Sequence, residues 1–305
     1  MNTKEIIKGL TEIILPVPRG GFESFIIGWH IDDKTRGRTI LMETGPASSV
    51  PQLIEDLKQM NAGEPDYLLY THIHLDHSGG AGQFHQKFPG TKIIAPLKGR
   101  PHLVDPERLI QGSRENLGDL CDVYGMPIPL PEEALADPNI ELDGLKIIDT
   151  PGHAPHHSSY LYDLDGVRIL FPGEAAGCYF ELPDGSVFMR PATPHKFFYE
   201  TAMGSLQKLI DLGDADLICY PHSGCSRDPK GLLVMAKEQM AFWKDIISAL
   251  PAGAGTEDGV KALLKHDPAL AQIGKLPKKD REREAFFLRQ SVDGYLGYVR
   301  RNAHS

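Results

Sequence analysis

The sequence predicts a layered α/β domain followed by a helical tail. Strand-like and helix-like runs alternate through the first third of the chain, several short strand-like runs lie close together between residues 145 and 171, and residues from 229 onward are helix-like. With 305 residues, of which 41% are hydrophobic, the chain is long enough for one large domain with an appendage. We therefore place a domain boundary between residues 228 and 229.

The elements of the first third can be assigned in order. Residues 24–31 and 38–43 are β-rich and separated by a polar turn, which predicts a hairpin. Apolar residues recur every three or four positions over 49–60, with Pro51 in the first turn, which predicts an amphipathic helix. A short buried strand is expected at 67–70.

The middle of the chain continues with a helix over 79–88 and a strand at 92–95. Residues 101–138 are rich in Pro, Gly and acidic groups, and we interpret them as an insertion near the site, acting as a lid. Turn residues then separate short strands, and Asp184-Gly185 marks a second tight turn. The expected strands cover residues 145–149, 158–162 and 167–171.

The tail is expected to form helices over 229–250, 258–266 and 279–301 that pack on the preceding domain. Charges alternate along residues 280–284, which we interpret as a solvent-exposed helix face. Aromatic residues near 179–180, 188 and 197–199 fit either a substrate pocket or the hydrophobic core.

Net charge and the lack of long apolar runs argue against nucleic acid and membranes as partners. The formal net charge is -9 and the isoelectric point is near 5.8, which argues against nucleic acid. We expect a cytoplasmic protein that does not engage a membrane, because the N-terminus lacks an apolar leader and no run approaches about 20 apolar residues. The four cysteines form no C-x-x-C pair and are expected to be buried small side chains.

The chemically informative feature is a cluster of four side chains, His72, His74, Asp76 and His77, where a strand ends and a helix begins. Residues two apart in extended chain share a face, so His72 and His74 can reach one ion. Asp76 and His77, on the turn into the helix, would point toward a second ion. Imidazole with carboxylate suits zinc, iron or manganese.

Two coordination shells need further ligands, and three candidates stand just after apolar strands and beside glycines. They are His153, Glu174 and His222. His156 and His157 compete with His153, because they lie only three and four positions further on. The other histidines are expected to have no role in the site.

The motif H-x-H-x-D-H, together with these three later residues, resembles the metallo-β-lactamase-fold hydrolases, over about residues 10–225. The resemblance implies a four-layer αββα sandwich over residues 1–228, with residues 229–305 as a helical extension. It also implies that His72, His74 and His153 bind a first metal ion, and that Asp76, His77 and His222 bind a second. The size and tail are similar to the glyoxalase II and lactonase branch.

One residue departs from the family pattern, in which an Asp usually bridges both metals. This chain has Glu174, which is one methylene longer and could bridge both ions or bind only one. Two-metal occupancy is therefore a weaker expectation than the fold.

The expected activity is hydrolysis of an ester, thioester or lactone carbonyl in a small molecule by hydroxide formed at two ions, most simply zinc. Asp76 would orient that hydroxide or take its proton. A mononuclear iron enzyme resembling persulfide dioxygenases is an alternative, and a non-catalytic metal-binding or regulatory module is another. A homodimer is the default assembly.

Overall fold

The computed structural model describes residues 2–213 and 215–302 and divides the chain into two compact units. The first unit comprises residues 1–148 and 160–169, and the second comprises residues 149–159 and 170–305. Each unit is therefore built from segments that are not continuous in sequence. The domain boundary expected at residue 229 stays a prediction.

The first unit contains a six-stranded sheet of order β1-β2-β3-β4-β5-β6. Strands β1 to β4 are antiparallel, and β5 and β6 continue the sheet in parallel. The expected hairpin is confirmed, with Trp29 opposite Met42, whereas the sequence analysis did not assign the first two strands. The strands are β1 (Thr3–Ile7), β2 (Leu10–Leu15), β3 (Ile26–Asp33), β4 (Arg38–Met42), β5 (Tyr67–Leu69) and β6 (Lys92–Ile94).

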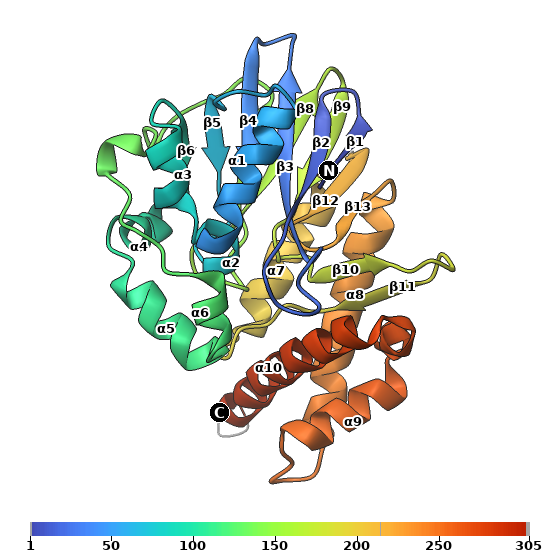
Figure 1. Cartoon of the computed structure of the whole chain (residues 1–305). Helices are drawn as coiled ribbons and strands as arrows, with labels where there is room; N and C mark the ends of the chain where they lie inside the picture. The colour runs from blue at the N-terminus through green and yellow to red at the C-terminus, as the bar shows by residue number, and fades with distance from the viewer. Residues whose placement is uncertain (1, 214, 303–305) are drawn as a thin grey trace. The chain divides into compact units, whose positions relative to one another are not determined.

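Helices of the first unit follow the apolar periodicity of the sequence. Helix α1 (Val50–Gln59) buries Leu53 and Leu57 on one side and lies across the sheet in Figure 1. The helix predicted over 79–88 is α3 (Ala81–Lys87), and a single turn, α2 (Leu75–Ser78), precedes it. The expected insertion carries α4 (Arg100–Val104), α5 (Glu107–Leu117) and α6 (Leu120–Tyr124).

Gly80, between α2 and α3, allows this compact connection. A Cβ atom at this position would lie 2.3 Å from Cγ2 of Val50 in α1, which is far inside van der Waals contact. The glycine therefore brings the end of α2 close to α1, and so fixes where the residues of α2 stand.

A second sheet has the order β13-β12-β9-β8-β7. The three strands predicted between 145 and 171 are all present, and the boundary between the two units passes through β9. The Asp184-Gly185 turn joins a separate hairpin, β10 (Cys178–Glu181) and β11 (Val187–Arg190). The sheet strands are β7 (Leu145–Asp149), β8 (Ser158–Leu164), β9 (Val167–Phe171), β12 (Leu217–Tyr220) and β13 (Gly224–Ser226).

The helical tail is confirmed as α8 (Pro229–Ser248), α9 (Thr256–His266) and α10 (Lys278–Asn302). Asp228 starts α8 by accepting a 2.9 Å hydrogen bond from the backbone N–H of Gly231, as an N-cap residue does. Helix α7 (Tyr199–Asp211) also belongs to the second unit and was not anticipated. Figure 1 shows α9 and α10 beside one another within this unit.

The expectation that residues 280–284 form a solvent-exposed face holds for Arg281 and Glu282 but is wrong for the two residues that follow them. Arg283 and Glu284 are 6% and 0% exposed. The Glu284 carboxylate accepts hydrogen bonds from Nε of Arg190 at 2.5 Å and from Nε of Arg283 at 2.8 Å. The charge of Glu284 on α10 therefore faces Arg190 of β11 and not solvent.

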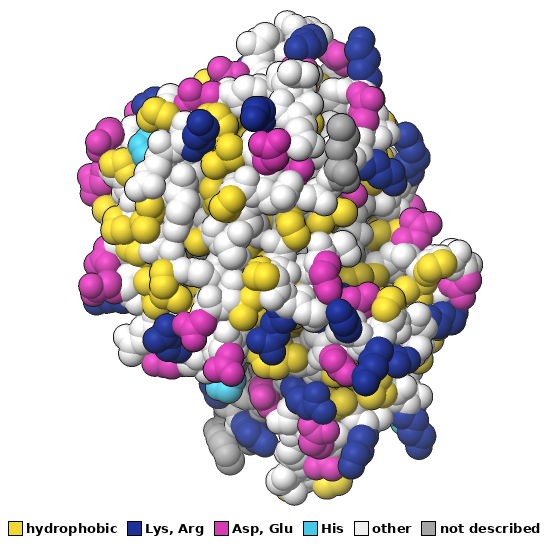
Figure 2. Space-filling model, viewed as in Figure 1, with side chains coloured by type: hydrophobic (Ala, Val, Ile, Leu, Met, Phe, Trp, Pro, Cys, Tyr) yellow, Lys and Arg dark blue, Asp and Glu magenta, His cyan; other side chains and the backbone are white. Residues whose placement is uncertain are grey.

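The remaining sequence expectations concern the core and the surface. Phe180 and Phe188 are buried in the core, Phe197 is buried but also lines a pocket with His153 and Glu174, and Phe198 is exposed. Among the described residues no helix is both long enough and apolar enough to cross a bilayer. Figure 2 shows acidic and basic side chains interspersed over the visible face.

Candidate metal centre

In the first unit, a buried carboxylate fixes the loop that follows β5. Glu43 ends β4 with a left-handed backbone (φ 64°) and is 1% exposed. Its Oε1 accepts hydrogen bonds from the Thr71 backbone N–H at 3.0 Å and from the Thr71 hydroxyl at 2.6 Å. The loop that carries His72 is therefore anchored to the end of the neighbouring strand.

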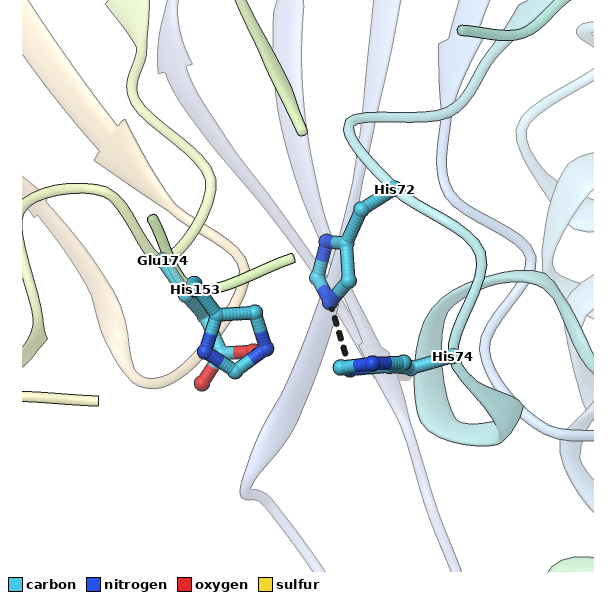
Figure 3. Close-up of side chains that lie close together, drawn as sticks. All are labelled: His72, His74, His153 and Glu174. Carbon is cyan, nitrogen blue, oxygen red and sulfur yellow. Dashed lines mark hydrogen bonds and ion pairs between the residues drawn. The ribbon is translucent and has the colours of Figure 1, made fainter. Parts of the chain in front are cut away.

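This anchor determines which nitrogen of His72 carries a proton. The Thr71 hydroxyl donates its only hydrogen to Glu43, so its oxygen accepts from Nδ1 of His72, 3.0 Å away. Nε2 of His72 is left with its lone pair, 3.0 Å from Nδ1 of His74. Figure 3 shows the two rings joined by this contact, and their planes are nearly perpendicular, at 82°. Two imidazoles arranged in this way suit one metal ion.

Asp76 and His77 lie on α2, immediately after this pair. Nε2 of His77 is 3.6 Å from Oδ2 of Asp76, and the His77 ring centroid is 4.1 Å from that of His72. Nδ1 of His77 stands 3.9 Å from the Glu43 carboxylate. Burial raises the pKa of Glu43, while His77 and the Thr71 donors oppose that rise. The four predicted residues of the first unit are thus gathered at one strand end; we call them the histidine cluster.

In the second unit, His153 and Glu174 face each other. Nδ1 of His153 donates to the carbonyl of Ala192 at 2.9 Å, so Nε2 is the ring nitrogen that faces the Glu174 carboxylate. Nε2 of His153 lies 2.9 Å from Oε2 of Glu174, and Figure 3 shows the two side chains together. His153 follows β7 and Glu174 follows β9, as the sequence indicated.

His222 completes the group in the second unit. It directly follows β12, is 2% exposed, and places Nε2 3.6 Å from Oε1 of Glu174. The two oxygens of Glu174 thus serve two different histidines. The next residue, Ser223, has a left-handed backbone (φ 61°) and its hydroxyl donates to the carbonyl of Tyr179. We call His153, Glu174 and His222 the glutamate cluster.

The structure also distinguishes His153 from His157. His157 is fully buried, and its Nδ1 lies 2.9 Å from the Thr150 hydroxyl. His153, not His157, is therefore the imidazole paired with Glu174. Cys178 places its sulfur 3.8 Å from Oε1 of Glu174, and burial raises the pKa of this thiol. Cys178 consequently remains a protonated thiol near neutral pH.

Both clusters fit divalent metal ions by their chemistry. His72 and His153 each have Nδ1 engaged by a fixed oxygen, which leaves Nε2 as a ligand atom. The remaining donors are imidazoles and the carboxylates of Asp76 and Glu174. Nitrogen with oxygen donors suits zinc, iron and manganese alike.

Sequence reasoning missed the residues that support these ligands. Glu43 and Thr71 hold His72, while Thr150 and His157 flank His153. Only their positions in the sequence could have indicated them. Glu43 and Thr150 each stand at the end of a strand-like run, next to a turn that contains Gly and Pro. Their partners could not be identified, because Thr71 follows a different strand from Glu43 and because the loop of Thr150 folds back on itself to reach His157.

Comparisons with known proteins agree with this geometry. The sequence model described as the metallo-beta-lactamase superfamily matches residues 29–222. A metallo-beta-lactamase fold-containing protein of Sulfurisphaera tokodaii is 30% identical over 199 residues, covering 61% of this chain and 69% of the relative. Hydroxyacylglutathione hydrolase of Xanthomonas campestris pv. campestris is 26% identical over 187 residues, covering 61% of this chain. The match spans only 56% of that enzyme's length.

Solved structures show the same fold. The structure of an archaeal superfamily protein from Sulfolobus tokodaii has a TM-score of 0.59 at 25% identity, and covers 87% of this chain and 98% of that one. A metallo-beta-lactamase family protein from Thermus thermophilus has a TM-score of 0.61 at 20% identity and covers 98% and 95% of the two chains.

The α/β fold and the two groups of histidine and carboxylate side chains define a protein of the metal-dependent hydrolase class. The chain belongs to the metallo-beta-lactamase superfamily.

Proposed function

We propose that this protein binds two divalent metal ions and hydrolyses an ester, thioester or lactone bond in a small molecule. His72, His74 and His153 would hold the first ion, and Asp76, His77 and His222 the second. This division follows the metallo-beta-lactamase superfamily to which the chain belongs. Zinc is the metal we propose.

The observation that carries the proposal is the position of Glu174. Its Oε2 faces His153 and its Oε1 faces His222, which are the proposed ligands of different ions. A carboxylate that offers one oxygen to each side is suited to bridge two ions. The positions of the two Glu174 oxygens therefore favour the two-metal form of the site.

The side chains of the site have separable roles. Bound metal ions would supply a water of lowered pKa and an electrophile for the substrate carbonyl oxygen. Asp76, whose side chain is 16% exposed, is placed to accept a proton from that water and to orient it. Glu43 and Thr71 hold His72 in the required tautomer, and Ala192 does the same for His153. Glu174 would set the spacing of the two ions.

The substrate class rests on the relatives. Hydroxyacylglutathione hydrolases of several bacteria are similar to this chain, which favours a thioester among the three bond types. A small-molecule substrate and a homodimer remain proposals. The interspersed charges in Figure 2 offer no continuous basic area for nucleic acid on the visible face.

The decisive experiment combines metal analysis with a substrate panel. Purified protein should contain up to two zinc ions per chain and cleave at least one thioester, lactone or simple ester. Asp76→Asn should lower kcat by about 10²- to 10⁴-fold, because proton transfer at the attacking water is lost. His266→Ala, at an exposed position in α9, should behave as wild type.

Two results would overturn the proposal. One is wild-type turnover by Asp76→Asn. The other is a single iron per chain with oxygen consumption on glutathione persulfide and no hydrolysis, which would identify an oxidoreductase.

A further inference from the structure

A chain of hydrogen bonds in the second unit links the loop of His153 to the loop of Glu174 through His157. The Ser159 hydroxyl donates to the carbonyl of Pro172 at 2.9 Å and lies 2.8 Å from the Thr150 hydroxyl. The Thr150 hydroxyl in turn lies 2.9 Å from Nδ1 of His157. At the other end, the Glu174 backbone N–H donates to Nε2 of His157 at 3.1 Å.

Only one placement of hydrogens satisfies all four contacts. A carbonyl accepts and cannot donate, so Ser159 uses its hydrogen on Pro172 and must accept from Thr150. Thr150 has then used its own hydrogen, so it must accept from Nδ1–H of His157. The Glu174 N–H can only donate, so Nε2 of His157 must be an acceptor. The Thr150 end requires a proton on Nδ1 and the Glu174 end requires a lone pair on Nε2, so the two ends together specify the neutral tautomer protonated at Nδ1.

We infer that His157 is a positioning residue: a neutral imidazole, protonated at Nδ1, that fixes the Glu174 backbone relative to the loop of His153. His157, Thr150 and Ser159 are each 0% exposed, so water does not replace these bonds. The loop of residues 150–157 is also closed by a 3.0 Å bond from the Thr150 N–H to the His157 carbonyl. The imidazole thus joins two already rigid segments.

The choice of histidine follows from this geometry. Among buried side chains, a neutral imidazole presents a donor on one side of a ring and an acceptor on the other. A hydroxyl is too short to span from Thr150 to Glu174, and a charged imidazolium has no acceptor for the Glu174 N–H. Of the common side chains, the amide of Gln alone approximates the same pairing of donor and acceptor. This inference rests on the proposed function only in treating Glu174 as a metal ligand.

The tautomer can be tested directly by long-range ¹H–¹⁵N NMR on the metal-free full-length protein. We expect the His157 signals of a neutral ring protonated at Nδ1, at pH values near neutrality. A ring protonated at Nε2, or at both nitrogens, would overturn the inference. This measurement needs neither a bound metal nor a substrate, so it is independent of the proposed hydrolysis.

The positioning role is tested by zinc affinity, measured in competition with a chromophoric chelator. His157→Ala should weaken binding of at least one zinc ion by about 10- to 100-fold, as loss of a residue that orients ligands does. His157→Gln should recover part of that loss and so bind zinc more tightly than His157→Ala. If His157 were needed only to fill space, the two variants would not rank in this order. The isosteric Thr150→Val change removes a hydroxyl while keeping His157, and should also weaken binding. His266→Ala is the matched control.

The variants distinguish the possible outcomes. Unchanged zinc affinity in folded His157→Ala and Thr150→Val proteins would overturn the inference, even if the wild type hydrolyses thioesters. If His157→Ala does not fold, Thr150→Val and the NMR tautomer decide the question. A protein that binds zinc as expected but cleaves no ester would count against the proposed function alone.

Discussion

Glu43 shows how one residue supports a site without belonging to it. A buried Glu in the left-handed region is unusual, because most side chains other than Gly, Asn and Asp avoid it. Such conformations persist where the surroundings determine them, and they concentrate at functional sites. Here the backbone turn places the carboxylate under the Thr71 donors and 3.9 Å from His77. Glu43 thereby contacts Thr71, which holds a ligand of the first proposed ion, and approaches His77, a proposed ligand of the second.

Two substitutions of Glu43, to Leu and to Gln, should distinguish the effect of its hydrogen bonds on stability from the effect of its size. Glu43→Leu leaves the Thr71 N–H and hydroxyl buried without an acceptor, so the free energy of unfolding should fall by about 2–4 kcal/mol. Glu43→Gln keeps an amide oxygen for both donors and should lose much less. Urea unfolding of the chelator-treated proteins measures both. Glu55→Leu, on the exposed side of α1, should have a smaller effect than Glu43→Leu. Equal stability of Glu43→Leu and wild type would show that Thr71 does not need this anchor.

At the scale of the element, local pattern predicted the helices and strands that have a clear apolar periodicity, whereas β1, β2 and α7 were not assigned. The exceptions have physical causes. Charges at 280–284 indicate an exposed face when read on the helix alone, yet Arg190 from β11 neutralises Glu284 inside the protein. The ligands His153 and Glu174 could be proposed from their positions after strands, whereas the Thr150–His157 contact depends on how a loop folds back on itself. The local sequence pattern does not show how this loop folds.

The pair formed by Glu284 and Arg190 should matter far more than an exposed pair that joins α9 to α10. Glu284→Ala leaves Arg190 buried without its carboxylate and should lower the free energy of unfolding by about 3–5 kcal/mol. Glu257→Ala breaks the exposed bridge to Arg289, 2.6 Å long, and should cost about 0–1 kcal/mol. The double change Arg190→Met with Glu284→Leu should restore part of the loss, because Arg190 is then no longer buried without a carboxylate, while Arg283 keeps only its ion pair with Asp280. Urea unfolding midpoints compare the variants, and equal effects of the two Ala changes would contradict this account.

At the scale of the whole molecule, the proposed ligands are divided between the two compact units. The histidine cluster belongs to the first unit and the glutamate cluster to the second. The sequence predicted the seven residues, because each follows a strand end in a recognisable motif. The sequence could not predict that these residues belong to two different compact units, because the units are defined by packing between segments that are distant in sequence.

Removing the metal should therefore destabilise both units together. An ion that binds only the native state stabilises it by mass action, by about 2.7 kcal/mol when free metal is 100 times Kd. Hydrogen exchange followed by mass spectrometry, with and without a chelator, should show faster exchange in residues 70–78 of the first unit and in residues 150–157 and 172–176 of the second. Added zinc should reverse the change in all three segments, while α9, remote in sequence from either cluster, should exchange at the same rate throughout. If only the segments of one unit respond, the ions are held by one cluster alone, and the shared site we propose does not form.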